Sequence, residues 1–244
     1  MRVLLLAAAV LAAVAVAVTA AFAQTGPSII PEFVVTPAKA GTKAKPRNAL
    51  VYTKGTIAGD YQATLSRLEY TIPPTIKIDG TGFPTCSADF INANGDDNCP
   101  KNSKVGTGAA TALLGPNKDR LDFDVEVYAA GPKALTIYLQ TNLFNIALPG
   151  TISGGVVGFD IPERVQQPVP GLYAYVTTVT AALGKQKGVP ASVRVRGKQR
   201  FFASTTGCRN RRHTGSVEAF LAPNPDPPPV ESVKVSATSR CTQP

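Results

Sequence analysis

Cationic side chains occupy every second position of one short run in the C-terminal half of the chain. Residues 164–217 hold ten Lys or Arg and no Asp or Glu. If the run forms a single β-strand, alternate side chains share one face and the cations form a ladder about 20 Å long. Such a ladder can bind anionic groups, because crowded like charges need a counter-charge. The predicted polyanion-binding residues are Arg194, Arg196, Lys198 and Arg200, extended by Arg209, Arg211 and Arg212.

An acidic stripe gives this ladder a simpler interpretation. Asp122, Asp124 and Glu126 alternate with apolar residues, as on the outer face of a strand. The acidic and basic strands could be neighbours whose charges pair across the sheet. The cations could also protect a sheet edge from aggregation. Both alternatives stay open beside polyanion binding.

The sequence also narrows the class of polyanion. Proteins that bind single-stranded nucleic acid usually place aromatic stacking platforms beside a basic groove. The ladder offers only Phe201 and Phe202, which are consecutive and so face opposite ways. We therefore expect no nucleic acid, and favour anionic cell-envelope polymers or lipid headgroups.

Residues for catalysis or metal binding are sparse. His213 is the only histidine, and it follows the basic segment 208–212, which favours a surface position. No G-x-S-x-G nucleophile motif occurs. The oxygen-rich segment 92–98 lacks the ligand order of a calcium loop and is interpreted as a polar helix end. We predict no catalytic residue, no metal site and no cofactor. A hydrolase with an unrecognised carboxylate pair is the alternative, and Asp160 with Glu163 is the nearest candidate.

The N-terminus predicts export. Met1 and Arg2 precede an apolar run over residues 3–20, and Ala21-Phe22-Ala23 is an A-x-A cleavage pattern. We predict a signal peptide over residues 1–23 and a mature domain over 24–244 with no transmembrane span. A retained membrane anchor is the alternative, because the run is about as long as the shortest spans. The expected location is secreted, extracellular or associated with the cell surface.

Export makes the four cysteines meaningful, because an even number in an oxidising compartment indicates disulfides. Four cysteines allow three pairings. Local pairing favours Cys86–Cys99 and Cys208–Cys241.

The sequence predicts that the elements carrying these residues are mostly β-strands. Short β-rich runs recur between Gly, Pro and Asp turn signals, which favours an all-β, antiparallel β-sandwich of Ig-like or jelly-roll-like type. One short helix is expected in the Cys86–Cys99 loop, with Ser87 as its cap and Gly95 at its end. The chain forms one domain or two β subdomains that meet near residues 130–155. The expected strands are Phe33–Thr36, Ala49–Thr53, Ala63–Thr71, Thr75–Ile78, Leu121–Ala129, Ala134–Leu139, Val156–Ile161, Leu172–Thr180, Val193–Phe202, Ser216–Leu221 and Ser232–Ala237.

Composition excludes several classes. The 244 residues carry a formal charge of +9, with 44% hydrophobic and 17% charged residues. That is too apolar and too sparsely charged for a disordered chain. With no Trp and few aromatic residues, a neutral-sugar site is disfavoured.

The cysteine segment carries a resemblance. Its pattern is Pro84-x-Cys86-Ser87, then Cys99-Pro100-x-x-Ser103-x-Val105-Gly106-x-Gly108, with the Lys-rich segment 37–46 upstream. This is similar to a group of secreted actinobacterial proteins with a P-x-C-S … C-P-x-x-S-x-V-G-x-G pattern. The resemblance covers roughly the first half of the mature chain. It implies a secreted β-rich domain and transfers no activity.

These observations predict a secreted or cell-envelope-associated, non-enzymatic structural or binding protein with a basic strand face. A third possibility is a domain that binds another protein through the apolar stretch 143–148, if that stretch is exposed. The sequence identifies no protein partner.

Overall fold

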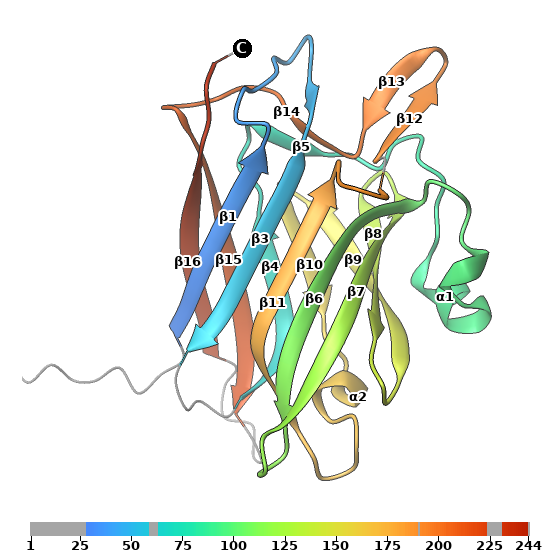
Figure 1. The fold of residues 1–244 in the computed structure, drawn as a ribbon, viewed down its shortest axis with the longest axis vertical. Coiled ribbons are helices and arrows are strands. Elements are labelled where there is room, and N and C mark those ends of the chain that lie inside the picture. Colours follow the sequence, from blue (N-terminus) through green and yellow to red (C-terminus); the bar gives the residue numbers. More distant parts are fainter. Residues whose placement is uncertain (1–27, 59–62, 190, 224–230, 244) are drawn as a thin grey trace, which may run out of the picture.

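One large antiparallel sheet dominates the structure. The computed structural model describes residues 28–58, 63–189, 191–223 and 231–243, so the predicted signal peptide lies outside the described residues. Eleven strands join in the order β1-β3-β11-β6-β7-β8-β9-β10-β4-β15-β16, and the sheet curls until it nearly closes into a barrel-like sandwich (Figure 1). None of the helices in the described ranges has the length and apolar character needed to span a bilayer.

The elements of the fold are mostly strands. The large sheet contains β1 (Ser28–Thr36), β3 (Leu50–Ala58), β4 (Ala63–Thr71), β6 (Lys104–Leu114), β7 (Asp119–Gly131), β8 (Ala134–Gln140), β9 (Asn145–Ser153), β10 (Val156–Asp160), β11 (Ala174–Gly184), β15 (Arg212–Pro223) and β16 (Glu231–Arg240). A small sheet contains β2 (Arg47–Asn48), β14 (Ala203–Thr205) and β5 (Ile76–Ile78), and a separate hairpin contains β12 (Ser192–Val195) and β13 (Lys198–Phe201). The helices are α1 (Ala88–Asn94), the 3₁₀ turn η1 (Asp96–Asn98) and α2 (Glu163–Gln166).

Alternation along the strands decides which side faces the core. In β7, Leu121, Phe123 and Val125 are buried, whereas Asp122 and Asp124 between them are exposed. Successive side chains of a strand point to opposite faces, so this pattern buries one face of the sheet and leaves the other in water. Inner faces from all around the sheet meet in one apolar core.

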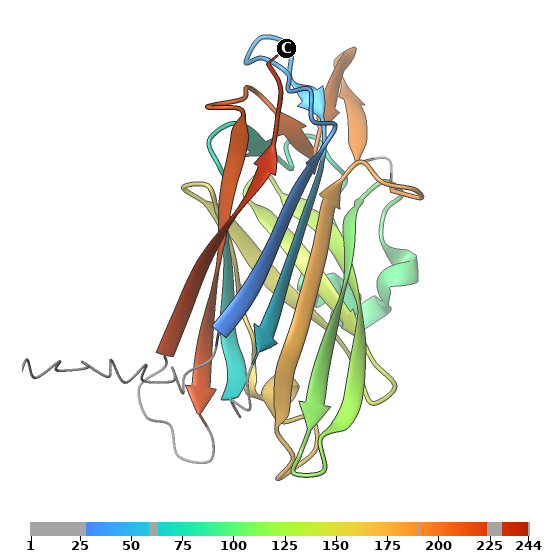
Figure 2. The same ribbon diagram turned by 60° about the vertical axis from the view of Figure 1, so that its left-hand side comes forward.

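The two terminal strands of the sheet lie side by side. The backbone N–H of Val35 in β1 donates to the Ser239 hydroxyl in β16 at 2.9 Å. Beyond these strands, Lys39 and Thr242 form a parallel bridge. Figure 2 shows β16 passing beside β1. These bonds satisfy part of the edge that an open sheet would expose.

The small sheet covers one end of the sandwich. Phe202, which directly precedes β14, and Ala203 at its start are fully buried, and the Phe202 ring meets Phe83 edge-on with centroids 5.6 Å apart. The N–H of Ala49 donates to the carbonyl of Ala203 at 3.0 Å, which ties this cap to the main sheet. Backbone segments that enter and leave the main sheet are therefore held together at this end (Figure 1).

The predicted fold class is confirmed, with both layers of the sandwich supplied by one curled sheet. The predicted disulfides Cys86–Cys99 and Cys208–Cys241 are both present. Helix α1 begins after Ser87, whose hydroxyl accepts from the N–H of Phe90, and it ends at Gly95 with φ 81°. The short helix α2, which follows Pro162, was not predicted.

Candidate anion-binding end

The predicted basic ladder is wrong in its geometry. The chain does not continue as one strand through residues 193–202 but turns back at Arg196 and Gly197, whose φ angles are 48° and 78°. In the resulting hairpin, Val193 is opposite Arg200 and Val195 is opposite Lys198. Opposed residues share a face, so Lys198 and Arg200 lie on one face, Arg194 on the other, and Arg196 at the tip.

Apolar residues anchor this hairpin at the capped end of the sandwich. Val193 packs against the main core. A Cβ placed on Gly82 would lie 2.5 Å from Cγ2 of Val195, so Val195 lies directly on that glycine. The four cationic side chains stay exposed, and the hairpin projects beyond the sheet (Figure 1).

The hairpin belongs to a larger concentration of positive charge. Residues 37–49 contain four Lys or Arg, residues 185–212 contain nine, and neither segment contains Asp or Glu. Both segments lie at the same end, because Thr36 pairs with Leu50 and Leu50 pairs with Gly184. All thirteen side chains are exposed, and none forms an ion pair with another described residue. We call this region the basic end; its cations are Lys39, Lys43, Lys45, Arg47, Lys185, Lys187, Arg194, Arg196, Lys198, Arg200, Arg209, Arg211 and Arg212.

A recess of about 700 Å³ opens at the basic end. Arg47, Lys185 and Lys187 line it from two chain segments, together with Asn48. The Asn48 Oδ1 atom is buried and has no hydrogen-bond partner among the described residues. The Arg47 guanidinium donates to the Lys39 carbonyl at 3.4 Å, which holds the two residues of this loop together. The recess can receive an anionic group, because its charged lining is cationic throughout.

The second disulfide holds the predicted arginines Arg209, Arg211 and Arg212 in a turn. Asn210 and Arg211 adopt left-handed φ angles of 50° and 58°, and the N–H of Arg212 donates to the Arg209 carbonyl at 3.0 Å. Cys208 and Cys241 then join this turn to the chain beyond β16, where the N–H of Cys241 donates to the Arg211 carbonyl at 2.9 Å. The N–H of Ala40 donates to the Thr242 carbonyl at 3.0 Å, which adds the Lys39 loop to the same assembly.

The acidic stripe does not neutralise these cations across a sheet. Its strand β7 pairs with β6 and β8, whereas β12 pairs with β13. Asp122 instead binds Arg120 at 2.8 Å, and the Thr111 hydroxyl followed by Arg120 lowers the pKa of Asp122. Glu126 binds Lys104. The cross-strand alternative for the ladder is therefore wrong.

His213 is buried rather than exposed, which corrects the prediction of a surface histidine. Its side chain is 1% exposed within β15, opposite Ser239 of β16. The ring Nδ1 lies 2.8 Å from the Thr75 hydroxyl, and Nε2 has no partner among the described residues. Burial lowers the pKa of His213, because the charged form loses its hydration. The period-two pattern of β15 places residue 213 inward although the two residues before it are arginines.

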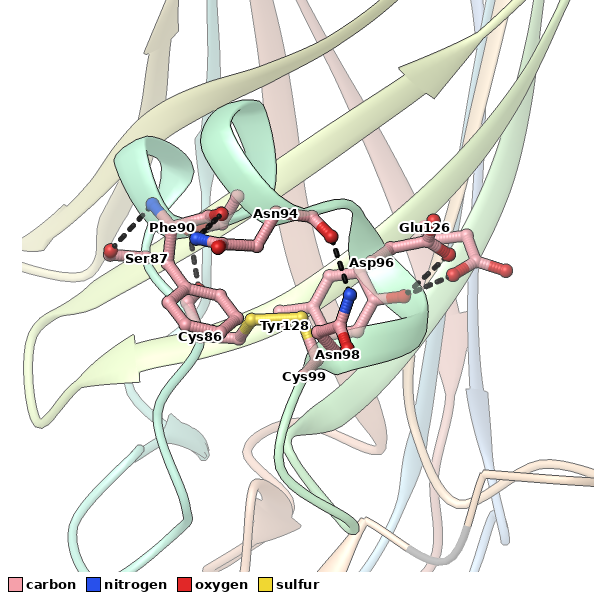
Figure 3. The surroundings of a disulfide bond; sticks show 10 residues. Cys86, Ser87, Phe90, Asn94, Asp96, Asn98, Cys99, Glu126 and Tyr128 are labelled. Carbon is pink, nitrogen blue, oxygen red and sulfur yellow. Dashed lines mark hydrogen bonds between the residues drawn. A yellow bond between two sulfur atoms is a disulfide. The ribbon is translucent and has the colours of Figure 1, made fainter.

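The polar segment around α1 is used structurally. Figure 3 shows the Cys86–Cys99 disulfide beneath α1, with the Tyr128 hydroxyl directed at Asp96 and Glu126. The Asn94 and Asn98 amides donate to the carbonyls of residues 90 and 94. Burial, followed by Glu126, raises the pKa of Tyr128. Within the described ranges, no set of three or more His, Cys, Asp or Glu side chains gathers for a metal ion.

Two other predicted features do not form open sites. The Asp160 carboxylate binds Arg67 at 2.5 Å and is 80% exposed, so it forms a surface ion pair and is not held in a buried pocket. In the stretch 143–148, Leu143 is exposed, but Ile146 and Leu148 are buried and Phe144 meets Phe123 edge-on at 6.2 Å. This stretch is therefore core rather than an exposed docking surface.

Sequence reasoning missed part of the basic end. It selected the hairpin and the turn at residues 209–212 but not Arg47, Lys185 or Lys187. The available signal was the same absence of acidic residues, since residues 33–59 also contain Lys and Arg but no Asp or Glu. What the sequence does not reveal is that these two segments meet at one end of the sheet.

No family model matches the chain, and comparisons with curated proteins and with solved structures return no match either.

Proposed function

We propose that this is a secreted or cell-envelope-associated, non-enzymatic structural or binding protein whose basic end contacts anionic envelope polymers or lipid headgroups. The observation that carries the proposal is the grouping of thirteen exposed cations, with no acidic residue in the two segments that hold them. They include the four hairpin cations predicted from the sequence. Export, inferred from the N-terminus and compatible with two disulfides, places such polymers within reach.

Charge density supports a polyanion more than a single small anion. The cations project from the hairpin, the Lys39 loop and the arginine turn, so no one small ligand reaches them all. A repeating polymer of phosphates or carboxylates presents many charges in succession and can contact each group. Arginine suits this task, because its guanidinium binds phosphate or carboxylate through two parallel hydrogen bonds.

Without a bound polyanion, only dissolved salt screens the repulsion among these unpaired cations. Positive side chains that lack acidic partners repel one another and lower the stability of the folded end. A bound polyanion removes that repulsion and releases the ions around both partners. Binding by this route weakens as salt rises, because the Debye length falls to about 8 Å at 0.15 M.

Salt-dependent binding tests the proposal. The purified, oxidised protein is titrated with teichoic acid, anionic liposomes, heparin and DNA, beside a variant in which Arg194, Arg196, Lys198 and Arg200 become Ser. Each exposed ion contact contributes roughly 0.2–1 kcal/mol, so the loss of four contacts should weaken binding of the best polyanion by about fourfold or more at low salt.

A second variant controls for net charge. Four exposed cations lie away from the basic end, and changing all of them to Ser removes the same formal charge: Lys118, Arg120, Arg164 and Lys234. This variant should bind at physiological salt nearly as the unaltered protein does, because screening shortens the reach of distant charges. Equal losses in both variants, or no binding by the unaltered protein at low salt, would refute a specific basic site. Strongest binding to DNA would refute the envelope assignment.

A further inference from the structure

The interior of the sandwich contains a cavity of about 100 Å³. Native cores pack densely and rarely leave voids larger than one water molecule, which needs about 10–15 Å³ by the same kind of measure. The cavity is therefore several times larger than an ordinary packing defect. Its wall includes Val51, Leu68, Phe123, Leu139, Phe159 and Val179.

Small inner residues on two adjacent strands, β6 and β11, leave this space. On β6 and β11 the inward positions include Gly108 opposite Ala181, and Ala110 opposite Val179. Ala110 also lies opposite Phe123 of β7, which fixes it on the inner face. Val179 is only half-buried although it faces inward. Alanine at positions 110 and 181 leaves space that larger side chains would fill, whereas a Cβ at Gly108 would lie 2.2 Å from the Thr180 carbonyl oxygen of β11.

Helix α2, at the end of the sandwich opposite the basic end, forms part of the cavity wall. Val165 of α2 is buried and lines the cavity with Ile161. Gln166 of α2 accepts from the Thr64 hydroxyl at 2.7 Å and donates to the Ile161 carbonyl at 2.7 Å. Figure 1 shows α2 at the lower end of the sheet. The helix is thus fixed in place as part of the wall.

The cavity wall offers nothing to a polar ligand. Among the described residues of the wall, none carries a charge, and hydroxyl groups come from Thr53, Tyr70 and Thr180 alone. Tyr70 is hydrogen-bonded to Thr53, and its burial raises the pKa of its phenol. The Thr180 hydroxyl bonds to both the N–H and the carbonyl of Ala109, at 2.9 and 3.1 Å. A ligand with its own polar group would lose hydration without gaining a free partner.

We propose that this cavity is a binding site for a small, uncharged apolar molecule, such as a hydrocarbon or a single aromatic ring. Apolar cavities of this order stay dry, and an engineered cavity of about 150 Å³ takes up benzene or xenon. A bound ligand makes van der Waals contacts with lining residues that lack contact partners while the cavity is empty. This inference rests on the interior of the sheet and is independent of the basic end.

Xenon is the direct probe, because it fills small apolar cavities without needing a polar partner. The purified, oxidised protein should shift the ¹²⁹Xe resonance saturably. Ala110→Leu places a larger side chain inside the cavity and should abolish the saturable shift. Ala109→Leu makes the same change on the exposed outer face of the same strand and should leave it intact. If Ala110→Leu does not fold, Ala181→Val replaces it as a smaller filling change.

Benzene and phenol test the chemical class. Benzene should raise the Tm of the unaltered protein, because a ligand that binds only the folded state stabilises it. Phenol at the same concentration should raise Tm less, since its hydroxyl would be buried unpaired. The absence of a saturable xenon shift would overturn the site, as would a shift that survives the filling variant. A larger effect of phenol than of benzene would overturn the apolar assignment.

Discussion

Replacing both Cys208 and Cys241 with alanine should lower the free energy of unfolding by about 4 kcal/mol. This cross-link spans 33 residues, and in the chain-entropy model it destabilises the unfolded chain by restricting a loop of that length. The Cys86–Cys99 bond spans 13 residues, for which the same model gives about 3 kcal/mol. The two double variants should therefore differ by about 1 kcal/mol.

The structure adds a second, functional difference between these variants. Cys208 and Cys241 fix the turn that carries Arg209 and Arg211 and bring it beside the Lys39 loop. Removing this bond should weaken polyanion binding although no cation is lost. Removing Cys86 and Cys99 should leave binding unchanged, because this bond holds α1 against β8 and β9 on the flank of the sandwich and fixes none of the thirteen cations (Figure 1).

Urea unfolding of the two double variants and the oxidised parent gives the stabilities, and titration with the best polyanion gives the affinities. Both measurements should start from conditions in which each variant is folded. Equal affinity of all three proteins would contradict the role assigned to the arginine turn. A stability loss that is larger for Cys86 and Cys99 would contradict the loop-length argument.

Two further predictions concern stability. Burial lowers the pKa of His213 in the folded protein, so the unfolded chain binds the proton more tightly. The contribution of His213 to the free energy of unfolding is therefore fully present above about pH 6.5 and is lost as the pH falls toward the lower folded pKa. The variant His213→Gln should flatten this part of the plot of urea midpoint against pH, and an unchanged plot would assign the dependence to other groups. A Cβ at Gly80 would lie 2.1 Å from the Gly131 carbonyl oxygen, so Gly80→Ala should lower the free energy of unfolding by about 1–3 kcal/mol in thermal melts. The control is Gly207→Ala, whose Cβ would have its nearest neighbour at 3.9 Å and which should change the melting temperature little.

Local signals in the sequence predicted some elements closely. Strand β4 has the predicted bounds Ala63–Thr71, because its apolar alternation is interrupted at both ends. Helix α1 has the predicted cap at Ser87 and the predicted end at Gly95. Strand β6 was missed, since its glycine and alanine residues have weak strand propensity and its register with β7 and β11 defines it instead.

The candidate site was predictable in composition but not in shape. The hairpin turn at Arg196 was hidden because arginine rarely adopts positive φ, and only Gly197 signalled it. The approach of residues 37–49 to residues 185–212 depends on strand pairing between segments far apart in sequence. Period-two alternation in β15 would have placed His213 inside, had the adjacent arginines not dominated the interpretation.

The position of the charges along the sandwich gives the molecule a permanent electric dipole. Its positive pole is the basic end, because cations and carboxylates are mixed at the opposite end, where Asp119 lies between Lys118 and Arg120 and Glu163 precedes Arg164 (Figure 1). In the field of an anionic surface this dipole experiences a torque that aligns the strands with the surface normal. The protein would then arrive end-on, already oriented before any side chain makes contact, with α2 and the base of the sheet facing outward.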